Sequence, residues 1–240
     1  MRPCNPLEIE TGSAHDRGVT VVEVLVAMLV AAVLSAIVIT TFVSITSAIA
    51  TAAAINRNTA GASNGMKEIS RQIRAATANP ISNTSVDSAI VQASNETLVI
   101  YAHANLQPSS AQSPIMVQLR VDPVGRSLIE DTWDGTLNSS GFWGFPSITS
   151  TPRLSIVLAA KVSQHFGANP FLFSYFAGSI AVPVPAGGSL TKAQRESITA
   201  IQVTLSVEGG ATSATGTTSE SSGLHPVTLQ NTVGMPNVNP

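Results

Sequence analysis

A long run without charge is the feature that most limits how this chain can fold. Between Glu23 and Arg57 the sequence contains no Asp, Glu, Lys or Arg, and positions 24–39 are apolar apart from one serine. A helix crosses the ~30 Å hydrocarbon layer of a membrane with about 20 residues, each advancing ~1.5 Å. A buried helix of a soluble protein is usually shorter and carries a polar stripe. We therefore expect a membrane-spanning helix here, with a buried core helix as the alternative.

The apolar run is too long for an ordinary secretion signal. Such signals have an apolar region of about 7–15 residues, followed by a small-x-small cleavage site. Residues 48–50 and 52–54 imitate that site, so a secreted domain released there is one alternative, and an uncleaved membrane anchor is another. Glu23 lies at the start of the apolar run. An unpaired charge at membrane depth is costly, so we interpret this carboxylate as a functional residue.

The residues that lead into the apolar run form a motif. Arg17 and Gly18 are followed by Val-Thr-Val-Val-Glu and then by the run itself. This arrangement resembles the processing and methylation motif of type IV pilins and pseudopilins. The resemblance implies that a prepilin peptidase cleaves after Gly18 and that the new amino terminus, on Val19, is N-methylated. It also places Glu23 at the fifth mature position, where the family keeps an acidic residue, and makes Glu23 and Thr20 candidate assembly residues.

Glu23 has a physical role in a chain processed in this way. Cleavage leaves a positive amino group at a helix N-terminus, which already carries partial positive charge from the helix dipole. The carboxylate needs a partner in lipid, and the amino group of a neighbouring subunit is a suitable one. In the family this contact is thought to set the stagger of subunits that enter the filament. The alternative is that Glu23 neutralises the amino terminus of its own chain.

The composition argues against two other kinds of protein. The 240-residue chain has 12 basic and 14 acidic residues, a formal charge of −2, and only 11% charged residues. It therefore lacks the basic balance expected of a protein that binds nucleic acid. Its single cysteine, Cys4, falls within a leader of residues 1–18, so we expect no disulfide framework in the mature chain.

The predicted helix continues past the membrane. Ile69 and Ile73 recur at helical spacing among charged residues, which indicates a helix with one face packed on a globular head. Pro80 predicts that the helix ends near residue 78, because the residue before a proline avoids the helical conformation.

Beyond Pro80 the pattern changes to the alternation that is typical of half-buried strands. The predicted strands cover residues 97–101, 115–121, 127–130, 153–161, 171–176, 197–207 and 227–230. The expected fold class is α+β, a long N-terminal α-helix packed against an antiparallel β-rich globular head. The expected divisions are residues 1–18 (prepilin leader), 19–43 (transmembrane and filament-core helix), 44–79 (extramembrane continuation of the helix), 80–208 (β-rich head) and 209–240 (Gly/Ser/Thr-rich loop with a C-terminal strand or tail).

The head contains no recognisable catalytic motif, so we expect no enzyme activity and no cofactor. Glu130, Asp131 and Asp134 place three carboxylates beside a glycine, and carboxylate oxygens are ligands that Ca²⁺ prefers. A Ca²⁺ site is one interpretation of this cluster, and an ordinary acidic turn is the alternative. Four aromatic side chains predict either a loop folded over the head or an exposed contact surface. They are Trp133, Phe142, Trp143 and Phe145.

The resemblance implies a structural minor pilin of a type IV pilus-like filament. A type II secretion pseudopilin is the alternative, and the run Ile-Ser-Arg-Gln-Ile-Arg over residues 69–74 resembles the helix end of minor pilins and J-type pseudopilins. The expected partners are prepilin peptidase, other pilin or pseudopilin subunits, an inner-membrane assembly platform and membrane lipid, with no nucleic acid. The expected location is a single-pass membrane protein with an extracytoplasmic C-terminal head, incorporated into a surface or periplasmic filament.

Overall fold

The computed structural model describes residues 19–103, 113–163, 171–207 and 227–236. The chain forms two compact units, Met1–Ile49 and Ala50–Pro240, and we call the second unit the head. The long helix α1, Val21–Arg74, runs through both units. The described strands pair antiparallel. The fold class is therefore α+β, a long N-terminal apolar helix with antiparallel sheets in a globular head, as the sequence predicts.

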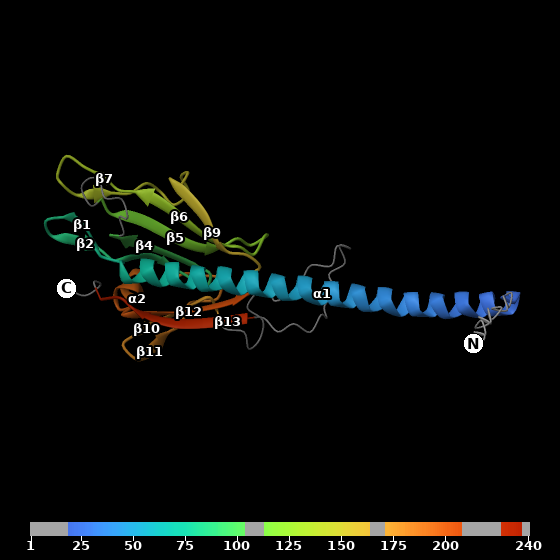
Figure 1. Ribbon diagram of the computed structural model, residues 1–240. Helices are drawn as coiled ribbons and strands as arrows, with labels where there is room; N and C mark the ends of the chain where they lie inside the picture. The colour runs from blue at the N-terminus through green and yellow to red at the C-terminus, as the bar shows by residue number, and fades with distance from the viewer. Residues whose placement is uncertain (1–18, 104–112, 164–170, 208–226, 237–240) are drawn as a thin grey trace, which may run out of the picture. The chain divides into compact units, whose positions relative to one another are not determined.

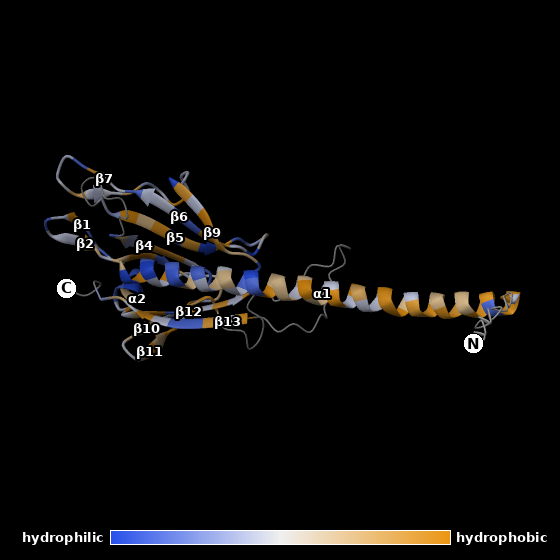
Figure 2. Ribbon diagram, in the orientation of Figure 1, coloured by the Kyte–Doolittle hydropathy of each residue, from blue (hydrophilic) through white to orange (hydrophobic). Residues whose placement is uncertain are grey.

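The part of α1 in the first unit is apolar and exposed. Figure 2 shows hydrophobic colouring along this part of the helix and more polar residues toward its C-terminal end. Its most apolar 18 residues have a mean hydropathy of 2.8, and none of them is buried. By length and composition this helix can cross a membrane. A core helix of a soluble protein would be mostly buried, so the structure argues against that alternative.

Two antiparallel sheets make up most of the head. The strands are β1 Asn79–Ser82, β2 Ser85–Asp87, β3 Ile90–Ala93, β4 Thr97–Ala102, β5 Ile115–Val121, β6 Leu128–Asp134, β7 Thr136–Leu137, β8 Trp143–Gly144, β9 Leu154–Ala159, β10 Phe173–Ala177, β11 Ile180–Val182, β12 Ala200–Val207 and β13 Val227–Gly234. Five of them form a sheet in the order β3-β4-β5-β6-β9, and four form a second sheet in the order β11-β10-β12-β13. Two small hairpins, β1 with β2 and β7 with β8, stand outside these sheets.

Each strand predicted from alternation overlaps an observed strand. β6 continues past the predicted residue 130 to Asp134, and β13 continues past residue 230 to Gly234. Sequence analysis missed β1, β2, β3, β7, β8, β11 and the helix α2, Lys192–Glu196. These elements are five residues or shorter, so few positions are available to reveal a period.

The helix α1 ends at Arg74, before the predicted end near residue 78. The backbone that follows bonds to β4, where the N–H of Thr77 donates to the carbonyl oxygen of Tyr101 (2.9 Å). Buried backbone groups need such partners, and a strand offers them here. The helix therefore stops where pairing with β4 begins, several residues before the proline would require it.

The second half of α1 lies between the two sheets of the head (Figure 1). On one side Gln72 Nε2 donates to Glu130 Oε1 in β6 (2.9 Å). On the other side Asn231 Nδ2, in β13, donates to Ser70 Oγ (2.9 Å). Apolar residues of the helix and of both sheets form one continuous core, so the helix is an integral part of the head.

The face of α1 that was predicted to pack on the head is buried. Ile69 and Ile73 have no exposed surface, which confirms the prediction.

One turn before Ile69, Gly65 lets the backbone of the helix come close to β9. A Cβ atom at this position would lie 3.2 Å from the carbonyl oxygen of Leu158, so an alanine would force a local shift.

Replacing Ile69 with alanine is expected to destabilise the head by roughly 3 kcal/mol, because the change empties a fully buried site. The control is Val124→Ala, a similar truncation of a side chain that is 90% exposed in the turn between β5 and β6. The control should stay within about 0.5 kcal/mol of the parent. The measurement is the free energy of unfolding of the full chain in detergent. Equal values for the two variants would contradict the packing described for Ile69.

Candidate assembly site

Thr20 caps the start of α1. Its Oγ1 accepts a hydrogen bond from the N–H of Glu23 (3.3 Å), and its carbonyl oxygen accepts from the N–H groups of Glu23 (3.0 Å) and Val24 (3.2 Å). A threonine followed three residues later by glutamate is the pattern of a capping box, whose hydroxyl satisfies a free N–H of the first turn. Sequence analysis included Thr20 among the assembly residues but missed this role, although the Thr-x-x-Glu spacing signals it.

Glu23 lies exposed in the first turn of α1, where the helix dipole favours a negative charge. No described Lys, Arg or His forms an ion pair with it. The carboxylate stands at the edge of an apolar surface, and a positive group from outside the described residues can therefore reach it.

Apolar side chains surround the helix behind Glu23. Every described residue of the first unit is exposed. Burying one Val, Leu or Ile side chain contributes roughly 1.5–3 kcal/mol, so this surface requires lipid or other helices around it. Its large, mostly exposed side chains include Leu29, Leu34, Ile39, Phe42 and Ile49.

The hydroxyl groups within this apolar stretch bond to the helix itself. Thr40 Oγ1 donates to the carbonyl oxygen of Ala36 (3.0 Å), and Thr46 Oγ1 donates to that of Phe42 (2.8 Å). Thr41 makes the same kind of bond one turn back. A hydroxyl without a partner is costly in hydrocarbon, and these internal bonds avoid that cost. The polar side chains of the stretch are therefore compatible with a membrane.

The start of this helix matches a known protein family. Residues 13–39 match the family described as the prokaryotic N-terminal methylation motif, over a segment that includes Gly18, Glu23 and much of the apolar run. The chain carries the type IV prepilin signature. No curated protein and no solved structure matches it significantly.

The prepilin signature has consequences for processing and assembly. It implies cleavage by a prepilin peptidase and assembly with other pilin subunits, and it indicates a structural subunit. The predicted cleavage point follows Gly18, which lies outside the described residues. Val19 is the first described residue, directly before the Thr20 cap. Cleavage at the predicted point would thus place the new amino group within the same turn region as Glu23.

The structure separates the three carboxylates of the predicted Ca²⁺ cluster. Glu130, Asp131 and Asp134 lie in the strand β6, so the acidic turn expected as the alternative is wrong. Successive side chains of a strand point to opposite faces of its sheet, so Asp131 faces away from Glu130 and Asp134. Asp131 pairs with Arg120 (2.7 Å) and Asp134 with Arg153 (2.9 Å). No three His, Cys, Asp or Glu side chains in the described part of the chain lie close enough to hold a metal ion. The arrangement does not support a Ca²⁺ site.

Glu130 is a buried carboxyl group that faces α1. Its side chain contacts Gln72, whose Nε2 donates to Glu130 Oε1 (2.9 Å) and to Glu68 Oε1 (2.8 Å). Burial, and then the negative charge of Glu68, raise the pKa of Glu130. The hydrogen bond from Arg71 holds the pKa of Glu68 below its ordinary value. Glu130 is therefore the member of the pair that binds a proton first as the pH falls.

The variant Glu130→Gln is expected to be more stable than the parent at neutral pH by roughly 1 kcal/mol. Because the pKa of Glu130 is raised in the folded chain, the folded chain holds this proton more tightly than the unfolded chain does, and protonation of Glu130 stabilises the fold. This contribution to stability is complete below the ordinary pKa of 4.5 and is lost as the pH rises through the raised pKa. Glutamine is neutral throughout, so the stability curves of variant and parent should meet in acid and separate as the pH rises.

Thermal unfolding of the full chain between about pH 4 and pH 8 measures this difference. The control is Glu196→Gln, which changes a half-exposed carboxylate in α2 and should follow the parent curve, because exposed ion pairs contribute little. A stability difference for Glu130→Gln that does not change with pH would contradict the assigned cause.

Two of the four predicted aromatic side chains, Trp133 and Phe145, pack in a small apolar cluster with Val99 and Met116, separate from the main core. Trp133 is 3% exposed, and Phe145 stacks beside Tyr101 with ring centroids 4.7 Å apart. Phe142 and Trp143 are half-buried. The segment with Phe142, Trp143 and Phe145 therefore packs partly on the head, as a folded loop would, and each of these three side chains keeps part of its surface exposed.

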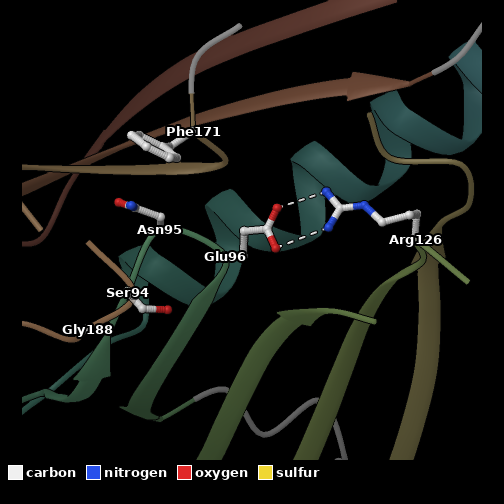
Figure 3. A pocket seen from close by; sticks show the side chains of 7 residues that line it. Ser94, Asn95, Glu96, Arg126, Phe171 and Gly188 are labelled. Atoms are coloured by element: carbon white, nitrogen blue, oxygen red, sulfur yellow. Dashed lines mark hydrogen bonds and ion pairs between the residues drawn. The ribbon is translucent and has the colours of Figure 1, made fainter. Parts of the chain in front are cut away.

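A cavity of about 460 Å³ in the head is lined by an ion pair that already satisfies both of its members (Figure 3). Arg126 Nη1 donates to Glu96 Oε2 (3.1 Å) and Nη2 to Glu96 Oε1 (2.8 Å), while Nε donates to the carbonyl oxygen of Val162 (3.2 Å). Figure 3 shows this pair on one side of the cavity, away from Asn95 and Phe171. The pair joins the turn before β4 to the turn before β6, which indicates a structural role.

Proposed function

We propose that this chain is a minor pilin, a structural subunit of a type IV pilus-like filament, and not an enzyme. The observation that carries the proposal is the coincidence of the prepilin signature with a helix whose apolar first part, up to residue 49, is wholly exposed. Such a surface needs an apolar environment, and proteins with this signature supply one to each other by assembly.

The proposed assembly exchanges one apolar environment for another. A prepilin peptidase cleaves after Gly18, and an inner-membrane platform receives the mature chain with residues 19–43 in lipid and the head outside the cytoplasm. The helix then leaves lipid and packs against helices of other subunits. The carboxylate of Glu23 meets the N-methylated amino group of Val19 on a neighbouring subunit, where the low dielectric strengthens their attraction. The Thr20 cap fixes the first turn, so the two charges have a defined offset.

A type II secretion pseudopilin is the second candidate. The run over residues 69–74, at the end of α1, resembles the corresponding helix end of both minor pilins and J-type pseudopilins, so it fits this candidate as well as the first. The two candidates share the same processing and the same helix, and they differ in the machine that receives the subunit.

The test is to shear filaments from cells that produce a tagged full-length chain, with and without prepilin peptidase. A minor pilin should be found in the sheared surface filaments only when the peptidase is present. A pseudopilin should be processed by the peptidase but remain with the cell, and its deletion should block protein secretion. A chain that stays uncleaved in the membrane in both strains would contradict both candidates.

A further inference from the structure

The two edges of the five-stranded sheet differ in how well they are covered. β3 forms one edge, and the segment that contains α2 closes it. The N–H of Leu190 donates to the carbonyl oxygen of Ala93 (2.9 Å), and Arg195 Nε donates to that of Ile90 (3.1 Å). Ser189 Oγ adds a further bond to the Ala93 carbonyl oxygen (2.8 Å). The main-chain carbonyl groups of Ile90 and Ala93 on this edge are thus occupied.

β9 forms the other edge, and no described strand pairs with its outer side. Its six residues include no charged side chain. Leu154, Ile156 and Val157 are 44%, 43% and 59% exposed. Natural proteins usually protect such an edge with charge, proline, a bulge or a covering segment, because its unpaired N–H and C=O groups can bind another strand. The pairing of β9 with β6 is irregular between Val157 and Ala159, but residues 154–157 pair regularly and carry no charge or proline. This part of the edge is apolar and lacks such protection, which indicates a place where an extended chain can add.

A groove of about 620 Å³ runs between this edge and α1. Leu154 and Ile156 line the β9 side, Arg71 lines the helix side, and Glu130 lies at the floor. Glu130 is 5% exposed, and its Oε2 has no hydrogen-bond donor among the described residues. The groove therefore combines an apolar β9 side with charged and polar side chains from α1 and β6, and with a buried carboxyl oxygen that lacks a donor among the described residues.

We propose that β9 accepts an additional strand from a neighbouring subunit of the filament, with side chains on the inner face of that strand filling this groove. The inference rests on the proposed function. The occupant follows from the chemistry of the site: the main chain of β9 requires an extended polypeptide, the exposed Leu154 and Ile156 require apolar side chains at alternate positions, and Glu130 Oε2 requires a basic, amide or hydroxyl donor. Lipid is unsuitable, because it supplies no partners for backbone groups.

Crosslinking in intact cells tests the proposal with the full chain. A photo-crosslinking amino acid is placed at Val157 on the open edge, at Val124 in the turn between β5 and β6, or at Leu29 in the apolar helix. Val124 is the control, because it is 90% exposed but lies away from any strand edge. Leu29 reports helix packing in the filament, independently of the head. We expect Val157 to crosslink to another pilin-like subunit with a yield at least tenfold above that of Val124.

The outcomes separate this inference from the proposed function. Crosslinks at Leu29, together with a Val157 yield no higher than that of Val124, would overturn the β9 contact and leave filament membership intact. Crosslinks at neither Val157 nor Leu29 would overturn both. A crosslink from Val157 to lipid or to a protein outside the filament would also contradict the proposal.

A pair of charge substitutions provides a second measurement. Val157→Lys puts a charge on the open edge, as natural edge strands do to prevent pairing, and should lower the amount of the chain in filaments at least tenfold. Val124→Lys makes the same change at the control position and should leave that amount unchanged. Both side chains are exposed, so equal thermal unfolding of the two variants would show that the head remains folded. Normal filament incorporation of Val157→Lys would contradict the added strand.

Discussion

The variant Glu23→Gln is expected to be processed and membrane-bound but incorporated into filaments roughly 100-fold less than the parent. Removing one partner of an ion pair in a low-dielectric environment costs about 3 kcal/mol, which corresponds to a factor of this size. Glutamine retains the shape of glutamate and is accepted at the same position of a capping box. The bond between Thr20 Oγ1 and the backbone N–H of residue 23 is therefore kept, and only the charge is lost. The measurement is the ratio of variant to parent in purified filaments at equal cellular levels.

Thr20→Ala is the complementary variant, because it removes the cap and keeps the charge. Loss of an N-cap costs about 1 kcal/mol, so its incorporation should fall only about fivefold. Normal assembly of Glu23→Gln, together with poor assembly of Thr20→Ala, would contradict the intermolecular ion pair. Glu23 would then serve its own chain, as a cap or as the partner of its own amino terminus.

The variant Gly18→Asp is expected to keep residues 1–18 and to be absent from filaments. A side chain at this position pushes the scissile backbone away from the peptidase, and a displacement of about 1 Å can slow an enzymatic reaction roughly 100-fold. Without cleavage the amino group of Val19 stays in a peptide bond, so no subunit offers a positive partner to Glu23. The intact mass of the chain measures the cleaved fraction.

The control for this variant is Gly12→Asp, which makes the same change elsewhere in the leader. It should be cleaved as fast as the parent and should enter filaments. Cleavage of Gly18→Asp at the parental rate would contradict the assigned processing point, and equal defects in both variants would point to a general intolerance of charge in the leader.

The long elements of the fold follow from local sequence. The uncharged run predicts the first part of α1 from its length and apolar composition alone, and the helical spacing of Ile69 and Ile73 predicts the part that packs on the head. β5 and β12 alternate along seven and eight residues, each with one face toward the core, so their period is visible without knowledge of the partner strands. The prepilin motif is equally local, since its residues are separated by only a few positions.

The features that the sequence could not predict depend on contacts between distant segments. α1 ends at Arg74 because β4, more than 20 residues later, provides partners for the backbone that follows. Glu130 is adjacent to Asp131 in sequence, but its hydrogen-bond partner Gln72 is 58 positions away. The apparent acidic cluster is therefore divided between two faces of a sheet. Proximity in sequence predicts a Ca²⁺ site only if the three carboxylates converge, and in a strand they do not.

The capping role of Thr20 is a different kind of omission, because its signal was local. The spacing Thr-x-x-Glu at the start of an apolar helix predicts a cap, and the structure places the Thr20 hydroxyl on the N–H of Glu23. The prepilin resemblance concerns the charge of Glu23, whereas the cap uses its backbone N–H. The cap and the proposed assembly contact are compatible, because the cap uses the hydroxyl of Thr20 and the assembly contact uses the carboxylate of Glu23.

Mass spectrometry of the mature N-terminus tests the central claim most directly, in cells with and without prepilin peptidase. The account predicts an N-methylated Val19 as the first residue when the peptidase is present, and an uncleaved leader when it is absent. A chain that begins at Met1 in both strains, or at Thr51 or Ile55, would contradict it. Glu23 would then have no role in assembly, and the head would belong to an anchored or secreted domain.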